Sequence, residues 1–572
     1  MKYKYIVAAV LVPVAALGAY FALRPYPRVP MERYIPANAI GFIEIDSVGD
    51  VVSGLTGTSA WRDLAPALGI SSQISQLGSA ADFIGRTGLG PAEAVILGRS
   101  QYAAVVTGLD AESSSSEDRL NINLRPRFCL IAETHSKPEV ASRLVKERTS
   151  IIAHRIFGES VSESSVDYAG DELLIEELQG THRKLVSAAS GSLILLGNDV
   201  DSLKSCLDTI RGRSASLAAD PVLTRNRSEV DRSAAVFAFV TASGIEKLLP
   251  LALGDTASRF TTNADRIALT AGLSEHLSKQ AITGFLYSQE FSSGGTTEKY
   301  LTALKPEIAG DLAEIMRPDS RPDAGLPIPE GAQYVTRLSV KHIGDLPDRI
   351  LKQLSRRMDL VAGLAMREFV KAFHKGLGLD VNDSIGDAVG SDVTVVQFGG
   401  DEPTAMLIDV RDRERLLPLV NKYLTASGYE VSSENQQGAD VMRSTNPDGR
   451  AAVFLDNTLV LCSRDQINKI LGARNNKSSA VDASAEACLV RSKNSVREAG
   501  EMMLAIARLT RVSDGSEELL DQEPLRSALG RIPKPVSFTQ FRESGVYTES
   551  RSAFGSFALI GLLSGEKANS RP

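Results

Sequence analysis

The sequence predicts an α+β protein of two related domains, each a mainly antiparallel sheet with helices packed on one face, preceded by one N-terminal transmembrane helix. Three observations lead to this prediction: segments that recur in the same order, apolar runs of strand length between stretches with helical spacing, and one long uncharged segment near the start. The chain has 572 residues, of which 43% are hydrophobic and 23% charged, as in folded proteins. This length exceeds what a single core organises.

The first element is the uncharged segment 5–23, which follows Lys2 and Lys4. At about 1.5 Å per residue it nearly matches a hydrocarbon core of roughly 30 Å. We expect a cytoplasmic tail at 1–4 and a single-pass anchor in the inner (cytoplasmic) membrane, with the bulk of the chain periplasmic or extracellular. A cleaved signal peptide is the alternative, because residues 14–16 (VAA) resemble a cleavage site.

Residues 24–33 (RPYPRVPMER) follow the anchor and contain three prolines and three arginines. The prolines favour extended polyproline geometry, so we expect a semi-rigid stalk. The arginines weaken the charge asymmetry that normally sets the orientation of a membrane segment. The formal charge of the whole chain is −7, and such an acidic balance excludes nucleic acid as a partner.

The two domains are predicted from repeated segments. Residues 35–42 read IPANAIGF and residues 328–335 read IPEGAQYV, with the isoleucine, the proline and the alanine at the fifth place in register. Later, SLILL at 192–196 is followed by Asp199, and TLVLC at 458–462 is followed by Asp465. We align Leu130 with Leu407 and Leu193 with Leu459. The shrinking offset between the copies is typical of loop insertions in a shared fold.

The first repeat is placed at 34–296, and its elements follow from apolar periodicity. We expect an opening strand, a largely helical stretch up to residue 85, a hairpin with a solvated polar insert, one helix, three strands and a second helix. The ranges in that order are 39–46 for the strand, 102–107 and 127–133 for the hairpin with its insert at 111–118, 138–151, 172–176, 185–189, 193–196 and 199–210.

Between the repeats, 297–327 is predicted to hold a helix at 297–316 and a turn-rich, proline-rich connector. The second repeat is placed at 328–565, with a polar tail at 566–572, and its elements repeat the order of the first. The expected ranges are 334–339 for the opening strand, 345–375 for helix, 393–398 and 405–410 for the hairpin, 413–426 for helix, 451–455 and 459–462 for strands, and 552–563 for a closing strand.

Residue types that hold metals or cofactors are present but scattered. No short metal-ligand spacing occurs among the histidines, and the cysteines lack C-x-x-C spacing. We predict neither a metal site nor a bound cofactor, and the sequence assigns no catalytic residue. One disulfide stays open, and the sequence does not choose its pair. The residues concerned are His135, His154, His182, His276, His342, His374, Cys129, Cys206, Cys462 and Cys488.

Glycine-rich spots at 88–91 (GLGP) and 376–379 (GLGL) lack the further glycines or the Gly-Lys-Ser/Thr ending of a phosphate loop, so helix termination is the better interpretation. No G-x-S-x-G occurs, and SGEK at 564–567 lacks the motifs that accompany S-x-x-K in enzymes. The acid pairs Glu44 with Asp46 and Asp380 with Asp383 fit a salt-bridged surface as well as a catalytic pair. The single tryptophan, Trp61, is expected to begin a helix and to pack.

This order of blocks, from I-P-x-x-A before the first strand to an apolar strand followed by an acidic helix start, resembles uncharacterised bacterial envelope proteins with a duplicated domain of unknown function behind one N-terminal anchor. The resemblance covers most of the chain from Ile35 onward. It implies bacterial origin and extracytoplasmic placement, and it supplies no functional residues.

The sequence favours a non-enzymatic, membrane-tethered binding or assembly module of the envelope. Its expected partners are the membrane, through 5–23, and an envelope protein, and the groove between the repeats is the expected contact surface. One alternative is an envelope hydrolase of unfamiliar type with a site between the two repeats. The other is a structural spacer.

Overall fold

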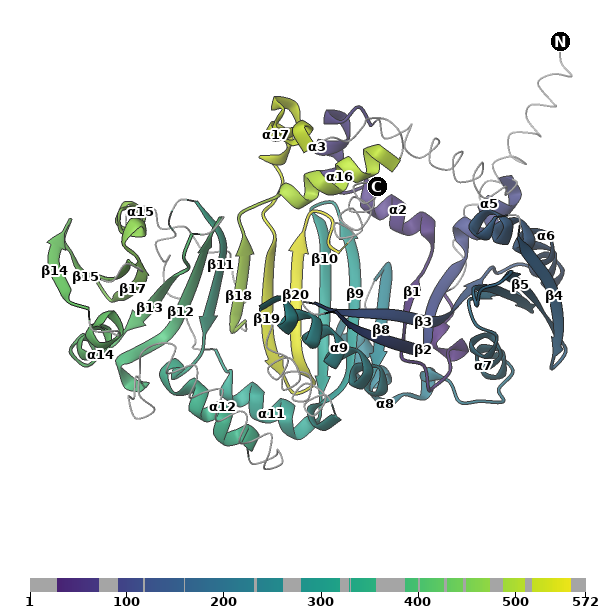
Figure 1. The fold of residues 1–572 in the computed structure, drawn as a ribbon, viewed down its shortest axis with the longest axis horizontal. Coiled ribbons are helices and arrows are strands. Elements are labelled where there is room, and N and C mark those ends of the chain that lie inside the picture. The colour runs from purple at the N-terminus through teal and green to yellow at the C-terminus, as the bar shows by residue number, and fades with distance from the viewer. Residues whose placement is uncertain are drawn as a thin grey trace, which may run out of the picture. The chain divides into compact units, whose positions relative to one another are not determined.

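The computed structural model describes residues 28–70, 91–116, 119–158, 160–230, 234–260, 279–318, 329, 331–355, 386–399, 402–425, 429–445, 449–473, 487–509 and 517–556. The chain folds into two compact units. Unit 1 takes in the described residues up to Asp50, those from Phe83 to Gly108, and Pro126–Ala219; unit 2 takes in the rest. Each is an α+β assembly around an antiparallel sheet, as the sequence predicts for the fold class (Figure 1).

The sheet of unit 1 is seven strands wide, and its neighbouring strands are hydrogen-bonded in the order β1–β2–β3–β7–β6–β5–β4. Successive residues of a strand point to opposite faces, so each strand contributes to two faces. Their bounds are β1 Gly41–Ile45, β2 Gln101–Ser116, β3 Arg119–Glu133, β4 Val161–Tyr168, β5 Asp171–Leu178, β6 Lys184–Ser190 and β7 Leu193–Gly197. Residues 109–116 of β2 and 119–125 of β3 belong to unit 2.

Helices cover both faces of this sheet, which corrects the prediction that they pack on one face. Cys129 and Leu130 are neighbours on β3 and therefore point to opposite faces. Leu130 lines a cavity under α6 (Pro138–Phe157), whereas Cys129 contacts Cys206 of α7 (Val200–Ile210). Asp199 caps α7 by accepting a hydrogen bond from the backbone N–H of Ser202, as its place before the helix predicts.

The sheet of unit 2 has its strands in the order β8–β9–β10–β20–β19–β18–β11–β12–β13–β17–β16–β15–β14. All of these pairings are antiparallel. The bounds are β8 Val236–Thr241, β9 Ile282–Ser292, β10 Gly295–Leu304, β11 Ala332–Ser339, β12 Val389–Phe398, β13 Ala405–Val410, β14 Val431–Gln436, β15 Ala439–Ser444, β16 Arg450–Leu455, β17 Thr458–Ser463, β18 Leu489–Lys493, β19 Val536–Arg542 and β20 Gly545–Ser552.

Two groups of helices in unit 2 lie near opposite ends of its central strands, with α3, α16 and α17 at one end and α11 and α12 at the other (Figure 1). Their bounds, with those of the remaining helices, are α2 Val48–Thr56, α3 Ser59–Ala67, α5 Pro91–Arg99 in unit 1, α8 Pro221–Val230, α9 Ala242–Phe260, α11 Pro306–Ile315, α12 Leu346–Ser355, α14 Arg413–Thr425, α15 Ile467–Ala473, α16 Arg497–Leu509 and α17 Glu523–Leu529. The 3₁₀-helices are η1 Met31–Tyr34, η2 Leu217–Ala219, η3 Ile343–Asp345, η4 Gly386–Ala388, η5 Arg464–Gln466 and η6 Glu517–Asp521.

One strand arrangement occurs in both units. The order β1–β2–β3–β7–β6–β5–β4 in unit 1 has the same form as β11–β12–β13–β17–β16–β15–β14 in unit 2. The helices agree as well, because α14 packs on the face that carries Ala452 and Phe454, while α15 packs on the face that carries Ala451 and Val453. In both units the helix after the hairpin and the helix after the last strand therefore cover opposite faces.

The register between these two sets of strands differs by one residue from our alignment of the sequence. Two residues, Gly191 and Ser192, join β6 to β7, and two residues join β16 to β17. Superposing the two turns matches Ile194, not Leu193, with Leu459. Because successive strand residues alternate in direction, the sequence alignment placed the matched leucines on opposite faces. When apolar residues fill both faces of a strand, its sequence does not alternate between apolar and polar residues. A register shift of one residue then cannot be detected from the sequence.

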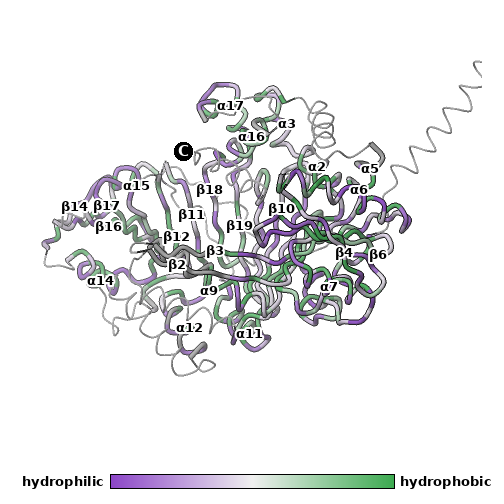
Figure 2. Tube along the Cα trace, turned by 45° about the vertical axis from the view of Figure 1, so that its right-hand side comes forward, coloured by the Kyte–Doolittle hydropathy of each residue, from purple (hydrophilic) through white to green (hydrophobic). Residues whose placement is uncertain are grey.

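The largest helical core of unit 2 joins α3 to α16 and α17. Trp61 is 4% exposed and Phe554 is 1% exposed in this cluster. Thr58 accepts a hydrogen bond from the backbone N–H of Trp61 and so caps α3, which confirms the packing role predicted for the tryptophan. All three helices mix hydrophobic and hydrophilic residues, as amphipathic helices with one buried face do (Figure 2).

Three predictions of local structure are wrong. Residues 28–33 are part of unit 1 and not a stalk, because Met31 is fully buried and the backbone N–H of Val29 donates to Gln101. The polar insert 111–118 is in large part strand, since β2 runs on to Ser116. The helix expected at 297–316 begins only at α11, and residues 297–304 belong to β10.

Other predictions fall outside the described residues: the tail 1–4, the anchor 5–23, the first part of the stalk, most of the connector, and the tail 566–572. Within the described part of the chain, no helix combines the length and apolarity needed to cross a membrane. The closing strand expected at 552–563 is preceded by β20, which ends at Ser552, and residues 557–563 are not described.

The four cysteines are free and buried, and their burial predicts their reactivity. A hydrogen bond with Cys206, together with burial, raises the pKa of the Cys129 thiol, and burial raises the pKa of Cys462 to about 12 and of Cys488 to about 11. The thiolate is the reactive form. We therefore expect iodoacetamide at pH 8 to modify none of the four in the folded, reduced protein and all four in urea, as measured by intact mass spectrometry. Labelling of Cys129 at equal rates in both states would contradict this burial.

Candidate functional site

Two cavities among the described residues combine depth with a distinct chemistry, and each lies inside one unit. The first, in unit 1, has a volume of about 190 Å³ and lies between α6 and the sheet; we call it the α6 cavity. The second, in unit 2, has a volume of about 270 Å³ and lies where β10 and β20 meet the start of α16; we call it the Glu298 cavity. Their linings differ in polarity, so each is a site of a different kind.

The α6 cavity is lined almost entirely by aliphatic side chains. Leu97, Ile152 and Ile194 in the lining are partly exposed, so the cavity opens to solvent. Partly exposed apolar groups in a concave site favour binding of an apolar ligand. The full lining is Leu97, Tyr102, Leu130, Ala132, Leu144, Val145, Arg148, Thr149, Ile152, Ser187, Ile194 and Leu196.

The hydroxyl groups of the α6 cavity are already in use. Thr149 donates to the carbonyl of Val145 at 2.7 Å and shares a hydrogen bond of 2.8 Å with Ser187. Tyr102 donates to the carbonyl of Leu97 at 2.5 Å, and burial raises the pKa of Tyr102 to about 12, so the phenol stays neutral at ordinary pH. These groups therefore present little unsatisfied polarity to a ligand.

Arg148 is the charged residue of this lining. Its Nη2 donates to both carboxylate oxygens of Glu93, each at 2.8 Å, and the two side chains are 23% and 15% exposed. Its Nε atom is buried and finds no acceptor among the residues that the structure describes. A buried donor without a partner costs free energy. Arg148 thus contributes an ion pair with Glu93 to the cavity wall, while its Nε atom is enclosed by protein atoms.

The corresponding place in the second set of strands is filled. With the turns superposed, Ala132 matches Ile408, Ser187 matches Ala452, and Ala189, which pairs with Ile194, matches Phe454. Phe454 is 3% exposed and packs with Val420 and Leu424 of α14. Ile408 and Phe454 have larger side chains than Ala132 and Ala189, the residues that they match. Of the two alanines, Ala132 lines the α6 cavity, and its match Ile408 packs against the cluster under α14.

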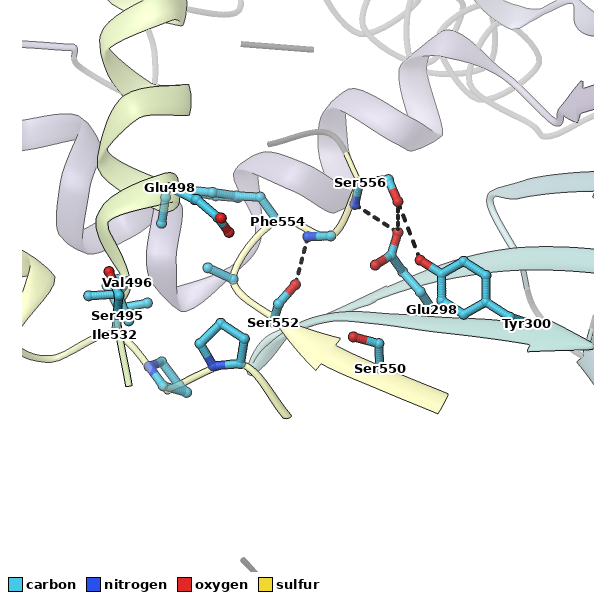
Figure 3. A pocket seen from close by; sticks show the side chains of 15 residues that line it. Glu298, Tyr300, Ser495, Val496, Glu498, Ile532, Ser550, Ser552, Phe554 and Ser556 are labelled. Atoms are coloured by element: carbon cyan, nitrogen blue, oxygen red, sulfur yellow. Dashed lines mark hydrogen bonds between the residues drawn. The ribbon is translucent and has the colours of Figure 1, made fainter. Parts of the chain in front are cut away.

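The Glu298 cavity is built around a buried carboxylate (Figure 3). Glu298 is 4% exposed, and its Oε1 atom accepts hydrogen bonds from Tyr287 at 2.7 Å, the backbone N–H of Ser556 at 2.7 Å and the Ser556 hydroxyl at 2.5 Å. Tyr300 lies 3.4 Å from the Ser556 hydroxyl. These contacts fasten the turn after β20 to β9 and β10.

The turn itself requires a glycine. Gly555 has a φ of 61°, in the left-handed region, and donates its backbone N–H to Ser552 at 2.9 Å. A Cβ atom at this position would lie 2.8 Å from the Cδ atom of Glu298, closer than real contacts allow. Only glycine permits both the conformation and the approach to the carboxylate.

The tyrosines beside Glu298 are held neutral. Burial and the negative charge of Glu298 raise the pKa of Tyr300 to about 12, and the same two causes raise the pKa of Tyr287 further. The two rings are neighbours, with centroids 5.1 Å apart. Neutral phenols donate hydrogen bonds, so the pair can supply donors to the carboxylate but no negative charge.

This network is a structural clamp more than a reaction centre. A general base must be within hydrogen-bonding reach of the substrate proton that it removes. Three protein donors occupy Oε1 of Glu298, and the hydroxyl of Ser556 is one of them. The rest of the wall is apolar or hydroxyl-bearing, with Glu498 ion-paired to Lys493.

Sequence reasoning missed this cluster because it assigned residues 297–316 to a helix. On a strand, Glu298 and Tyr300 share a face, as do Tyr287 and Gln289 on β9, and the register places Glu298 opposite Gln289. Alternation of large polar residues in two adjoining segments was the available signal.

One of the two acid pairs lies among the described residues, and both of its members occupy places that a structural role predicts. Glu44 is buried in β1, and Asp46 pairs with Arg28 at 2.8 Å. Asp380 and Asp383 are not described, and neither are residues 88–90, 376–379 and 564–567.

The described histidines are far apart in the sequence and lie in turns or at a helix end. His182 and His342 are exposed, His135 stands in the turn after β3, and His154 bonds the carbonyl of Ser150 one turn earlier on α6 at 2.9 Å. His276 and His374 are not described. Among the described residues, no three side chains of histidine, cysteine, aspartate or glutamate gather as a metal site.

Comparison with known proteins gives no relative: no family model, no curated protein and no solved structure matches this chain.

Proposed function

We propose that this protein is a non-enzymatic binding module of the bacterial envelope that holds an apolar ligand in the α6 cavity. The observation that carries the proposal is the cavity itself, an aliphatic recess of about 190 Å³ with partly exposed walls. Burial of apolar surface is the main favourable term in such binding. The counterpart around Phe454 supports it further, because there the larger side chains Ile408 and Phe454 pack under α14 at the positions matched to Ala132 and Ala189.

We further propose that the chain consists of two related repeats, at 34–296 and 328–565, behind a single-pass anchor at 5–23 with the bulk of the chain outside the cytoplasm. The recurring strand order and the matched placement of α6 with α14 and of α7 with α15 support the duplication. The uncharged run after Lys2 and Lys4 supports the anchor. An anchored module would meet apolar ligands at the membrane surface, alone or with an envelope protein partner.

The test is capture of the tagged full-length protein from solubilised native membranes, followed by mass spectrometry of the small molecules that come with it. We compare the unmodified protein with Ala132→Ile, which introduces the side chain found at Ile408, and with Ala215→Ile, which changes an exposed alanine in the same unit. We expect one apolar compound to be enriched about tenfold or more in the unmodified protein and in Ala215→Ile, and to be lost in Ala132→Ile, since a filled cavity excludes it. Equal recovery with both variants would overturn the proposal.

A further inference from the structure

We infer that the Glu298 cavity binds a primary alkylammonium group, with Oε2 of Glu298 as its charged partner. The inference concerns unit 2 and is independent of the apolar ligand proposed for the α6 cavity of unit 1. It follows from three features of the cavity: a buried carboxylate with one oxygen atom unpartnered, hydroxyl acceptors beside that oxygen, and an apolar recess of limited size.

Glu298 carries a buried negative charge that no described cation balances. Its side chain is 4% exposed, and the hydrogen bonds from Tyr287 and Ser556 all go to Oε1. Oε2 has no hydrogen bond or ion pair with the residues that the structure describes, and it points away from Ser556 toward the side of Ser552 (Figure 3). Buried charges in proteins are normally paired, so an unpartnered oxygen at a cavity wall indicates a cationic ligand.

A ligand can reach this oxygen. Oε2 is not one of the side-chain atoms that lack a partner and are enclosed by protein, and Glu298 lines the cavity. The other carboxylate of the wall, Glu498, is already ion-paired to Lys493. Among the described residues that line the cavity, none is basic. The cavity therefore has one unbalanced negative charge, which attracts a cation and repels an anion.

Hydroxyl groups beside Glu298 complete a set of acceptors for an ammonium. The strand register places Ser550 directly opposite Glu298, so both side chains lie on one face of the sheet. The Ser550 hydroxyl has no hydrogen-bond partner among the described residues, and the Ser552 hydroxyl accepts from the backbone N–H of Gly555. An ammonium has three donors and no acceptor, which matches one carboxylate oxygen and two hydroxyl oxygens.

The state of Oε1 favours an ammonium over a guanidinium. A guanidinium binds a carboxylate best when it contacts both oxygens at once. Oε1 of Glu298 already accepts hydrogen bonds from Tyr287 and Ser556, so only Oε2 is left for a ligand. The described residues also hold no group of three side chains suited to a metal ion. The site therefore fits a cation that contacts the carboxylate at a single oxygen.

The recess next to these acceptors fits a short alkyl chain. Its apolar walls include Val496, Ala499, Ile532, Pro533 and Pro535. An apolar cavity of about 150 Å³ is large enough for benzene, so about 270 Å³ accommodates an amine of roughly six to ten non-hydrogen atoms. A free alkylamine and the lysine side chain of a protein partner share this chemistry.

The experiment is equilibrium dialysis of the full-length protein in detergent against radiolabelled 1-pentylamine, with unlabelled competitors. 1-Pentanol and pentanoate have the same chain length and serve as the uncharged and the anionic competitor. We expect pentylamine to bind at one site per chain, and both competitors to displace it about tenfold less well than unlabelled pentylamine, because a charge-assisted hydrogen bond is about twice as strong as a neutral one.

Substitutions locate the binding. Glu298→Gln removes the charge but keeps an oxygen acceptor for Ser556, and it should weaken pentylamine binding about tenfold or more. Ser550→Leu places a larger side chain on the same face and should abolish binding. Glu549→Gln is the matched control, because Glu549 lies on the opposite face of β20, where it pairs with Arg551 at 2.7 Å, and binding should be unchanged.

A further competitor, lysine blocked at its amino and carboxyl ends as the acetyl and methylamide derivative, distinguishes the two sources of the amine. If it displaces pentylamine, the cavity takes a lysine side chain from a partner. If pentylamine binds and the blocked lysine does not displace it, the ligand is a free amine. Both results support the alkylammonium site.

Three results would overturn the inference: no binding of pentylamine, equal competition by pentanol, or undiminished binding to Glu298→Gln. Urea unfolding followed by the fluorescence of Trp61 shows that the variants are folded, since Trp61 packs in the same cluster as Ala499 and Phe554 of the cavity wall. Capture of an apolar compound that depends on Ala132 would be unaffected by any of these results.

Discussion

Replacing Phe554 with alanine is expected to lower the free energy of unfolding of unit 2 by about 4 kcal/mol, the usual cost of removing a fully buried phenylalanine. Phe554 is 1% exposed and packs in the cluster that joins α3, α16 and α17. The loss combines the transfer free energy of the ring with the cavity left behind, because three helices fixed by other contacts collapse only in part.

Urea unfolding followed by the fluorescence of Trp61 measures this loss directly, since the single tryptophan lies in the same cluster. Tyr429→Ala serves as the control, because Tyr429 is 36% exposed in the same unit and its removal should cost less than about 1 kcal/mol. If the two variants lose equal stability, Phe554 does not hold these helices together and the described packing at the end of β20 is wrong.

Removal of the Glu298 carboxylate is the second change with a large expected effect. Glu298→Ala leaves both donors of Ser556 without their acceptor, while the Tyr287 hydroxyl keeps Oε1 of Gln289 at 3.2 Å. Each buried donor that loses its partner costs about 1–3 kcal/mol, and part of this is recovered by water entering the adjacent cavity. We expect a net loss of about 3 kcal/mol, measured by the same urea titration.

Glu298→Gln distinguishes the hydrogen bonds from the side-chain volume. The amide keeps an oxygen acceptor but lacks the charge, so we expect a smaller loss of about 1 kcal/mol. The variant should also titrate differently. The Glu298 charge raises the pKa of Tyr300, so its removal should let tyrosinate absorbance appear at lower pH.

The free energy of unfolding of the unmodified protein should fall at alkaline pH, because Tyr300 loses its proton more readily in the unfolded chain. The pKa of Tyr300 rises from about 10 in the unfolded chain to about 12 in the folded protein. Between these values the unfolded chain has lost more protons, so stability falls as pH rises through this window. Glu523→Ala, which removes a highly exposed partner of Arg526, should alter neither stability nor titration. A similar response of Glu298→Ala and Glu523→Ala would contradict the clamp.

Much of the fold could be predicted because local pattern and tertiary environment agree. The strands at 172–176, 185–189 and 193–196 lie in β5, β6 and β7. Their apolar residues fill both faces of a buried sheet, so a short apolar run was enough to identify each strand. Helix starts such as that after Asp199 were also visible, since a cap depends on residues three positions apart.

Strand β10 could not be predicted from its own residues. Residues 296–300 read TTEKY, a polar stretch without the apolar alternation of a typical strand. Its partners are β9 and β20, and the register with β20 joins Glu298 to Ser550. The partner β20 lies about 250 residues away, but β9 is joined to β10 by only two residues, Ser293 and Gly294, so the local signal was the turn of a hairpin, which the helix assignment overlooked.

The candidate site could likewise be predicted only in part from the sequence. Arg148, Ala132 and Ser187 belong to elements that the sequence identified, yet nothing in their local pattern distinguishes a cavity wall from a packed core. The comparison that distinguishes them, of Ala132 with Ile408 and of Ala189 with Phe454, depends on the register of two hairpins. That register differs by one residue from the alignment of the apolar runs.

By itself, the sequence determined the α+β class, the order of most strands and helices, and the helix starts near Trp61 and Asp199, because each depends on neighbours within a few residues. Only the tertiary structure decided that helices cover both faces of the sheets, that β10 is a strand, that a turn near the end of the described chain is clamped to Glu298, and that space remains under α6. These features depend on contacts between distant segments and on the volume that their side chains leave unfilled.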